Sequence, residues 1–134
     1  MAGKLLLEIV TPARKVLSEE VDMVVAPGEL GEFGVLVNHI PFLTKLKVGE
    51  LRFKVGASTR YVAIMGGYAE VLPDKVTILA TAAEEATDID VIRAQAAKER
   101  AERRLREAKD RVEFARAQAA LQRALARLKV AERR

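Results

Sequence analysis

Glycine and proline are confined to the first 87 residues of this chain. All eight glycines and all four prolines lie there, and residues 88–134 contain neither. Because these two residue types interrupt helices and are typical of turns, the first part is restricted to short elements, whereas the last part can form uninterrupted helix. The distribution predicts two units: a compact β domain over residues 1–87 and a helical segment over residues 88–134.

The first unit consists of short apolar runs separated by turn residues. The stretch Leu51–Val55 (LRFKV) alternates with a period of two, which places apolar side chains on one face of a strand and basic side chains on the other. Pro-Gly, Gly-Gly and Pro-Asp pairs, which are typical of turns, separate the runs. The pattern predicts an antiparallel β-sandwich of about ten strands. The last five of these strands are expected over residues 42–48, 51–55, 60–65, 68–72 and 75–80.

The second unit carries apolar residues at spacings of three and four, which is typical of helix. One stripe consists of Ala94, Ala97, Ala101, Leu105 and Ala108, and the other of Phe114, Ala117, Leu121, Ala124, Leu125 and Leu128. The stripes are out of phase across residues 109–111, which predicts an antiparallel two-helix hairpin and hence an α+β fold. An unbroken helix, in which Val112 continues the first stripe, is the alternative arrangement. Thr87 and Asp90 resemble a capping box that begins the first helix, with Asp88 as a second possible cap.

The composition offers little for catalysis. The chain has no cysteine, which excludes disulfides and cysteine-based metal sites. Its one histidine, His39, has no partner residues in a catalytic pattern, and a lone histidine does not make a metal site. Glycines 28, 31 and 34 are interspersed with acids and precede no helix, so tight turns are favoured over a phosphate-binding loop. We expect neither an enzyme active site nor a metal centre.

No apolar run approaches the roughly 18 residues that a membrane-spanning helix needs. The leucines that follow Lys4 form a run of three, too short for the core of a signal peptide. We therefore expect a soluble protein that is cytoplasmic or attached to a partner at a membrane.

Positive charge is concentrated in the helical segment. Residues 1–87 carry nine basic and eleven acidic side chains, whereas residues 88–134 carry 14 basic and eight acidic ones. A basic helical hairpin is one way to grip nucleic-acid phosphates, so a nucleic-acid-binding module is an alternative function. The interspersed acids and the single aromatic residue of the segment, Phe114, argue against it, because no stacking platform for bases is present.

Four arginines of the segment stand at spacings that favour a common site. Arg93 and Arg100 share one face of the first helix, and Arg123 and Arg127 share one face of the second. A turn at Asp110 would bring Arg127 opposite Arg93, where a triphosphate would bind the clustered guanidinium groups. In one straight helix the same two residues would stand about 50 Å apart. Anion binding would then be coupled to the bend; plain surface charge is the alternative.

Several motifs of the first unit, in their order and spacing, resemble the epsilon subunits of bacterial F-type ATP synthases. They are residues 31–36 (GEFGVL), 38–41 (NHIP), 66–71 (GGYAEV) and 73–77 (PDKVT). One departure is Val37-Asn38, where bacterial relatives often carry Pro-Gly before the histidine. Because asparagine tolerates left-handed backbone, we expect this turn to be kept.

The helical segment resembles the nucleotide-binding epsilon subunits of thermophilic bacilli. Residues 89–94 (IDVIRA) resemble their Ile/Leu-Asp-x-x-Arg-Ala motif, and residues 96–105 (AAKERAERRL) are also similar. The resemblance implies ATP as a regulatory ligand and leaves the role of magnesium open. The ATP contacts that it implies are Glu84, Ile89, Asp90, Arg93, Arg100, Arg123 and Arg127.

The resemblance also implies a place in the synthase. The sandwich would dock on the gamma subunit and the membrane-embedded c-ring within the central stalk, with Glu32 and His39 taking part. Extended helices would inhibit ATP hydrolysis by the alpha/beta catalytic head, and ATP would favour the folded hairpin. The subunit would be non-catalytic, bound at the cytoplasmic face of the cell membrane only through the complex, and would not bind nucleic acid. A free-standing ATP sensor is a further alternative.

Overall fold

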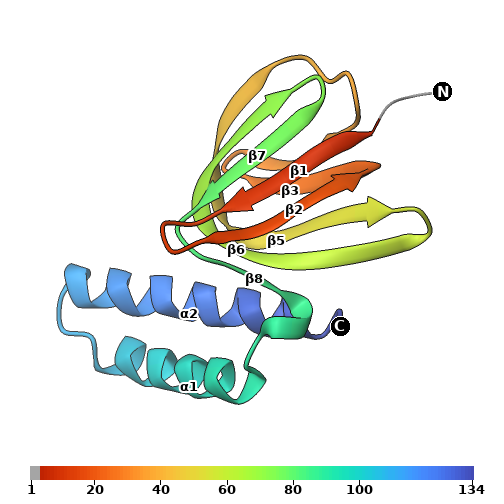
Figure 1. Cartoon of the computed structure of the whole chain (residues 1–134). Helices are drawn as coiled ribbons and strands as arrows, with labels where there is room; N and C mark the ends of the chain where they lie inside the picture. The colour runs from red at the N-terminus through yellow and green to blue at the C-terminus, as the bar shows by residue number, and fades with distance from the viewer. Residues whose placement is uncertain (1–3) are drawn as a thin grey trace.

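The computed structural model describes residues 4–134 as a β-sandwich with two helices packed against one side (Figure 1). The sandwich therefore precedes the helices in an α+β fold, as predicted. Its strands are β1 (Leu5–Val10), β2 (Lys15–Val21), β3 (Met23–Gly28), β4 (Gly31–Val35), β5 (Phe42–Val55), β6 (Ser58–Leu72), β7 (Lys75–Ala80) and β8 (Ala83–Glu85). A 3₁₀ turn, η1 (Ala86–Asp88), leads into α1 (Val91–Glu107) and α2 (Arg111–Ala131).

The strands form one hydrogen-bonded sheet that folds over on itself. Their order is β2-β1-β7-β6-β5-β3-β4, and β8 pairs with β6 beside this path. All pairs recorded for residues 4–134 are antiparallel except β1 with β7, where Leu7 lies opposite Val76 in a parallel register. Sequence patterns did not indicate this pair, because a parallel pair needs a long crossover rather than a recognisable hairpin turn.

The described chain has eight strands rather than about ten, because two pairs of predicted strands are continuous. β5 and β6 pair from Phe42 opposite Val71 to Val55 opposite Ser58, so the ladder holds both strands together across the expected breaks. Gly66 and Gly67, with φ of 80° and 135°, bend β6 without ending it. Among glycines 28, 31 and 34, a positive φ is found at Gly31.

Gly67 is the position in the sheet where a side chain would be least tolerated. A Cβ built there would lie 2.0 Å from the carbonyl oxygen of Leu79 and 2.9 Å from the Cα of Ala80, both backbone atoms of β7. We expect Gly67→Ala to lower the free energy of unfolding by about 3 kcal/mol, from backbone strain and overpacking together. Denaturant titration measures this loss.

Gly56→Ala is the matched control, because Gly56 also has a positive φ, 62°, but has nothing within 4 Å of the added Cβ. This variant should lose about 1 kcal/mol from backbone conformation alone. Equal losses in the two variants would contradict the importance of the close approach between β6 and β7.

The sandwich core is mostly aliphatic, with Phe53 also fully buried, and ion pairs join neighbouring strands on the outer face. Leu5, Leu7 and Ile9 of β1 are fully buried. Glu8, which points to the opposite face, bridges Lys15 of β2 and Lys75 of β7 at 2.7 Å each. Hydrogen bonds from these two ammonium groups lower the pKa of the Glu8 carboxyl from 4.5 to about 2. The bridge across three strands therefore remains ionised through mildly acidic pH.

The helical segment is bent, as the phase slip predicted. α1 ends at Glu107 and α2 begins at Arg111, with Asp110 as its N-cap accepting a hydrogen bond from Glu113 N at 2.8 Å. The N-cap of α1 is Asp90. The interpretation of Thr87 and Asp88 as possible caps is wrong, because both residues belong to the 3₁₀ turn before the helix.

The fully buried residues where the two helices face each other are alanines. Ala94 and Ala101 of α1 and Ala117 and Ala124 of α2 are buried. Phe114, which the second stripe placed in the contact, is instead 49% exposed. Alanine faces bury little apolar area, so this packing is close but contributes little free energy.

α2 lies between α1 and the sandwich, over β5 and β6 (Figure 1). A second buried cluster joins it to the sheet, separate from the sandwich core. Its members are Ala63, Met65, Ala86, Ile89, Val130 and Ala131. Since α2 meets the sheet mainly through its last turns, the hairpin is attached to the sandwich at one end.

Candidate anion-binding site between the two helices

The two helices and β8 line an open cavity of about 530 Å³. Its charged lining consists of five arginines and two acids, and its apolar lining is made of alanines. These residues are Arg93, Arg100, Arg104, Arg123, Arg127, Glu84 and Asp90, with Ala82, Ala94, Ala97, Ala101, Ala120 and Ala124. Such a site suits a polyanion, because guanidinium groups form charge-assisted hydrogen bonds with phosphate oxygens.

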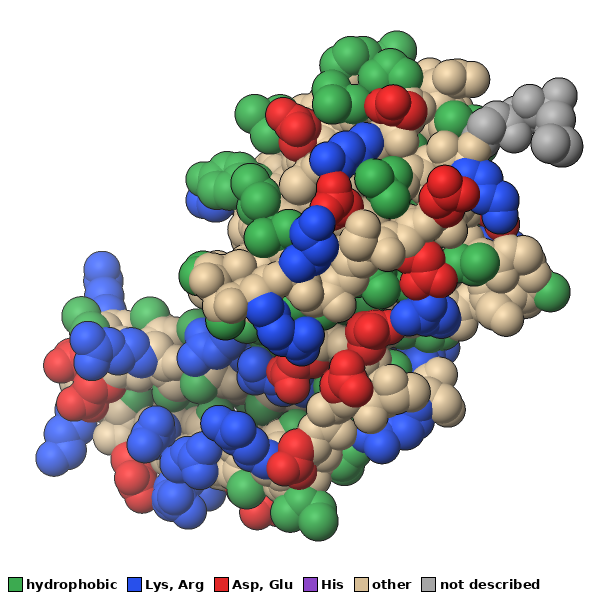
Figure 2. All heavy atoms as spheres, in the orientation of Figure 1, with side chains coloured by type: hydrophobic (Ala, Val, Ile, Leu, Met, Phe, Trp, Pro, Cys, Tyr) green, Lys and Arg blue, Asp and Glu red, His purple; other side chains and the backbone are tan. Residues whose placement is uncertain are grey.

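Helical spacing explains why the arginines converge. Arg93, Arg100 and Arg104 follow one another at seven and four residues along α1, and Arg123 and Arg127 are four apart on α2. The alanines between them bring the helix backbones close, so the longer arginine side chains lie around the rim. In Figure 2, Lys and Arg side chains gather over the two helices.

The two acids connect the cavity to the rest of the fold. Glu84 of β8 forms an ion pair with the Nε of Arg127. Asp90 caps α1 by accepting a hydrogen bond from Arg93 N at 3.0 Å. Of the five cavity arginines, only Arg127 has an ion-pair partner within the described residues. With five arginines against two acids, the lining of the cavity carries a net positive charge.

The structure brings together all but one of the residues suggested as ATP contacts. Ile89 does not line the cavity: its side chain is 4% exposed in the cluster under α2. Arg104 lines the cavity but was missed from the sequence. Its spacing of four from Arg100 was the available signal. Charged residues surround it closely along α1, so this spacing alone did not distinguish it.

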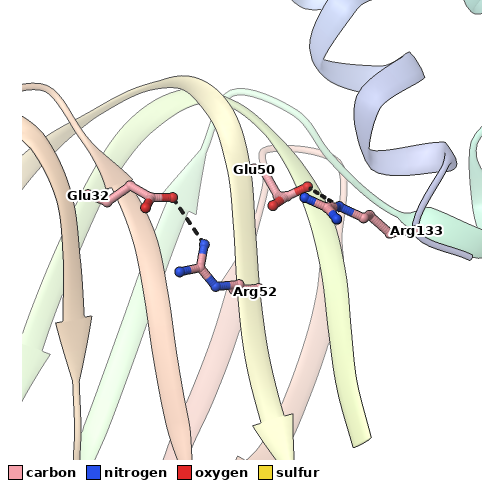
Figure 3. Close-up of polar contacts among 4 residues, drawn as sticks. All are labelled: Glu32, Glu50, Arg52 and Arg133. Atoms are coloured by element: carbon pink, nitrogen blue, oxygen red, sulfur yellow. Dashed lines mark hydrogen bonds and ion pairs between the residues drawn. The ribbon is translucent and has the colours of Figure 1, made fainter.

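Glu32 and His39 lie away from this cavity, in and after β4. Arg52 of β5 donates a hydrogen bond to Glu32 Oε2 at 3.1 Å (Figure 3). His39 Nδ1 donates to the carbonyl oxygen of Ile40 at 2.7 Å. Asn38 has a φ of 69°, which confirms that the turn is kept with asparagine in place of glycine.

The loop that holds His39 lies at the end of the sandwich remote from the helices (Figure 1). Asn38 N donates to the carbonyl oxygen of Pro73 at 2.6 Å, which joins this loop to the β6–β7 turn. Large apolar side chains of this region are exposed: Leu36 by 59%, Ile40 by 75%, Phe42 by 41%, Leu43 by 71% and Leu72 by 37%. An exposed apolar group of this kind is typical of a protein interface.

Two known protein families match the two parts of the chain. The family described as "ATP synthase, Delta/Epsilon chain, beta-sandwich domain" matches residues 4–86. The one described as "ATP synthase, Delta/Epsilon chain, long alpha-helix domain" matches residues 87–132. Within residues 4–134, no helix has the length and apolarity to cross a membrane.

Similar bacterial proteins include the ATP synthase epsilon chain of Syntrophobacter fumaroxidans, 77% identical over 133 residues and 99% of both chains. The epsilon chain of Nitratidesulfovibrio vulgaris is 58% identical over 115 residues and 86% of both chains. A chain from the Euglena gracilis mitochondrial ATP synthase has the same fold, with a TM-score of 0.83 at 24% identity; 98% of this chain and 83% of that chain are covered. The chain therefore belongs to the ATP synthase delta/epsilon family, among the bacterial epsilon chains.

Proposed function

We propose that the protein is a central-stalk rotor subunit of a proton-translocating F-type ATP synthase. The observation that carries this proposal is the match of both parts of the chain to the ATP synthase delta/epsilon family, with 77% identity to an epsilon chain over 99% of either sequence. The subunit performs no chemistry itself. It is held at the cytoplasmic face of the cell membrane by the complex and transmits ring rotation to the catalytic head.

The sandwich docks on the gamma subunit and the c-ring through its end remote from the helices. The exposed apolar residues at that end, Leu36, Ile40 and Leu43 among them, support this orientation, because a surface of this kind is stabilised by burial against a partner. His39 lies in the loop at this end, and Glu32 of β4 is held by Arg52 of β5; both residues provide polar contacts to the partners.

The helices regulate ATP hydrolysis, and the arginine-lined cavity binds ATP when they are folded. Support comes from the five arginines that line one cavity in the bent form, since unfolding the hairpin would separate those of α1 from those of α2. A ligand that binds only this form stabilises it by RT ln(1 + [L]/Kd), about 2.7 kcal/mol at a hundredfold excess over Kd. Between two alanine-rich arrangements of similar free energy, such a term reverses the preferred state.

Co-purification tests the place in the stalk. The full chain, expressed with gamma and the c-ring subunit from the same synthase, is expected to form a stable complex with both. Replacing Leu36, Ile40 and Leu43 by serine should remove it from that complex, because these exposed side chains contribute to docking rather than to the core. Serine variants that still assemble with gamma and the ring would contradict this docking surface.

A further inference from the structure

A buried carboxylate lies beneath the end of α2. Glu50 of β5 is the one buried charged residue recorded for residues 4–134, and its side chain is 7% exposed. The Nε of Arg133 donates a hydrogen bond to Glu50 Oε2 at 3.2 Å (Figure 3). Within the described chain, Arg133 is the only ion-pair partner that Glu50 has. The residue that compensates this buried charge therefore comes from beyond the last turn of the helical hairpin.

Two further contacts hold the same end of the chain. The guanidinium group of Arg133 stands over the ring of Tyr61 on β6, 5.1 Å from its centroid. The next residue, Arg134, donates from Nη2 to the carbonyl oxygen of Ile89 at 2.7 Å. The two residues after α2 therefore contact β5, β6 and the segment that precedes α1.

Because Glu50 is charged, the contact favours the docked position of the helix only while Arg133 compensates that charge. A carboxylate removed from water is costly unless an opposite charge compensates it, whereas the same carboxylate is well hydrated once the covering segment leaves. The apolar contact around it combines three alanines with larger buried side chains, namely Met65, Ile89 and Val130, and these contribute to docking independently of charge. Beside this apolar contact and the ion pair of Arg127 with Glu84, the Arg133 contact is the one that a buried carboxylate requires.

We propose that Arg133, Glu50 and Tyr61 form a latch that keeps the hairpin docked on the sandwich and must open before the helices can leave it. This inference rests on the proposed function only in taking the hairpin to be detachable. In the absence of ATP, the latch rather than the helix–helix contact sets the equilibrium between docked and released helices. ATP then adds to a preference that the latch already sets.

Thiol labelling of the full chain without nucleotide tests the latch. The chain has no cysteine, so Ala126→Cys and Ala131→Cys each provide a single reporter where α2 packs against the sandwich. Labelling by a maleimide then measures how often the helix lifts, even when the lifted state is rare. We expect Arg133→Gln to accelerate labelling at both positions about tenfold, the effect of losing a partly buried ion pair.

Lys129→Gln is the matched control, because it removes one positive charge from the exposed face of α2 beside the latch. It should change either rate less than about twofold, as expected for exposed charge. Equal rates for Arg133→Gln and Lys129→Gln would overturn the latch. Acceleration with the Ala131→Cys reporter alone would also overturn it, since this result means fraying of the last turn without lifting of the helix.

A double-mutant cycle isolates the ion pair. Once Glu50→Gln has removed the buried charge, Arg133→Gln should accelerate labelling only slightly, because no carboxylate is then left without a partner. An undiminished tenfold effect in the Glu50→Gln background would refute the role of Glu50. Exchange of β1 and β7 amides, unchanged in all variants, shows that the sandwich is intact.

Labelling of the reporter variants that keep Arg133, measured with and without ATP, tests the latch and the proposed ATP binding independently. Slower labelling with ATP, together with acceleration by Arg133→Gln, supports both proposals. Rates that respond to Arg133→Gln but not to ATP support the latch and contradict ATP binding in the cavity. Rates that respond to ATP but not to Arg133→Gln contradict the latch and leave the proposed function in place.

Discussion

Replacing both Arg93 and Arg127 by alanine is expected to abolish measurable ATP binding by the isolated chain, whereas the unsubstituted protein is expected to bind one ATP per chain. The two arginines line the cavity from opposite helices. A hydrogen bond to a charged group is worth about 1.5–3 kcal/mol, so losing two weakens binding by at least about a hundredfold. The loss of Arg127 also leaves Glu84 without its partner beside the ligand phosphates. Isothermal titration calorimetry measures both results.

The control for this variant removes the same charge from the same two helices. Arg103→Ala with Lys129→Ala takes one exposed cation from each helix, and neither residue lines the cavity. ATP should bind this control with an affinity within about threefold of the unsubstituted protein, because exposed charges interact weakly. If both double variants lost affinity equally, general positive charge would account for binding. If the unsubstituted chain bound no ATP at millimolar concentration, the sensor proposal would be wrong and the stalk proposal would stand.

Removing residues 88–134 is expected to raise ATP hydrolysis by a reconstituted synthase several-fold at low ATP. The sandwich ends before this segment, so its docking surface at the remote end remains. Without the helices, nothing of this chain can extend toward the catalytic head and disfavour hydrolysis. Steady-state hydrolysis by complexes containing either the full or the shortened chain measures the difference.

The same experiment carries its own control for assembly. The shortened chain must co-purify with gamma at the stoichiometry of the full chain, because deletion uncovers Ala63 and Met65 of the sandwich. At high ATP the hydrolysis rates of the two complexes should become similar, since we expect ATP to favour the folded helices of the full chain. Equal hydrolysis at low ATP, with assembly intact, would show that the helices do not inhibit.

Local patterns in the sequence predicted the α+β architecture and favoured the bend over one unbroken helix, which the sequence left open as an alternative. The slip between the two alanine stripes located the turn at Asp110, because helical periodicity is a property of neighbouring residues. Features that depend on contacts between residues distant in the sequence were harder to predict. The continuity of β6 through Gly66 and Gly67 follows from its pairing with β5 and β7, which no local pattern contains.

In the candidate site too, residues placed by local spacing were predicted correctly, whereas residues placed by tertiary contacts were not. Arg93, Arg100, Arg123 and Arg127 share faces by simple spacing, so a turn at Asp110 was enough to predict that they meet. Ile89 was assigned to the site only through its motif, and the structure buries its side chain in the contact with the sandwich. Phe114 has helical spacing appropriate to the contact, but it lies in the first turn of α2, before the first buried residue of that helix, Ala117, and stays exposed.

The parallel pairing of β1 with β7 fixes an order of folding. Leu7 pairs with Val76, so the sheet cannot close on the ribosome until nearly all of the sandwich sequence has been synthesised. Contacts so distant in sequence form slowly, whereas the two helices depend on near neighbours and form within microseconds. The helical segment is synthesised last, and it docks once β5 and β6 offer it a finished surface. Its docking is the last step in folding, and in the mature protein it is the step most easily reversed.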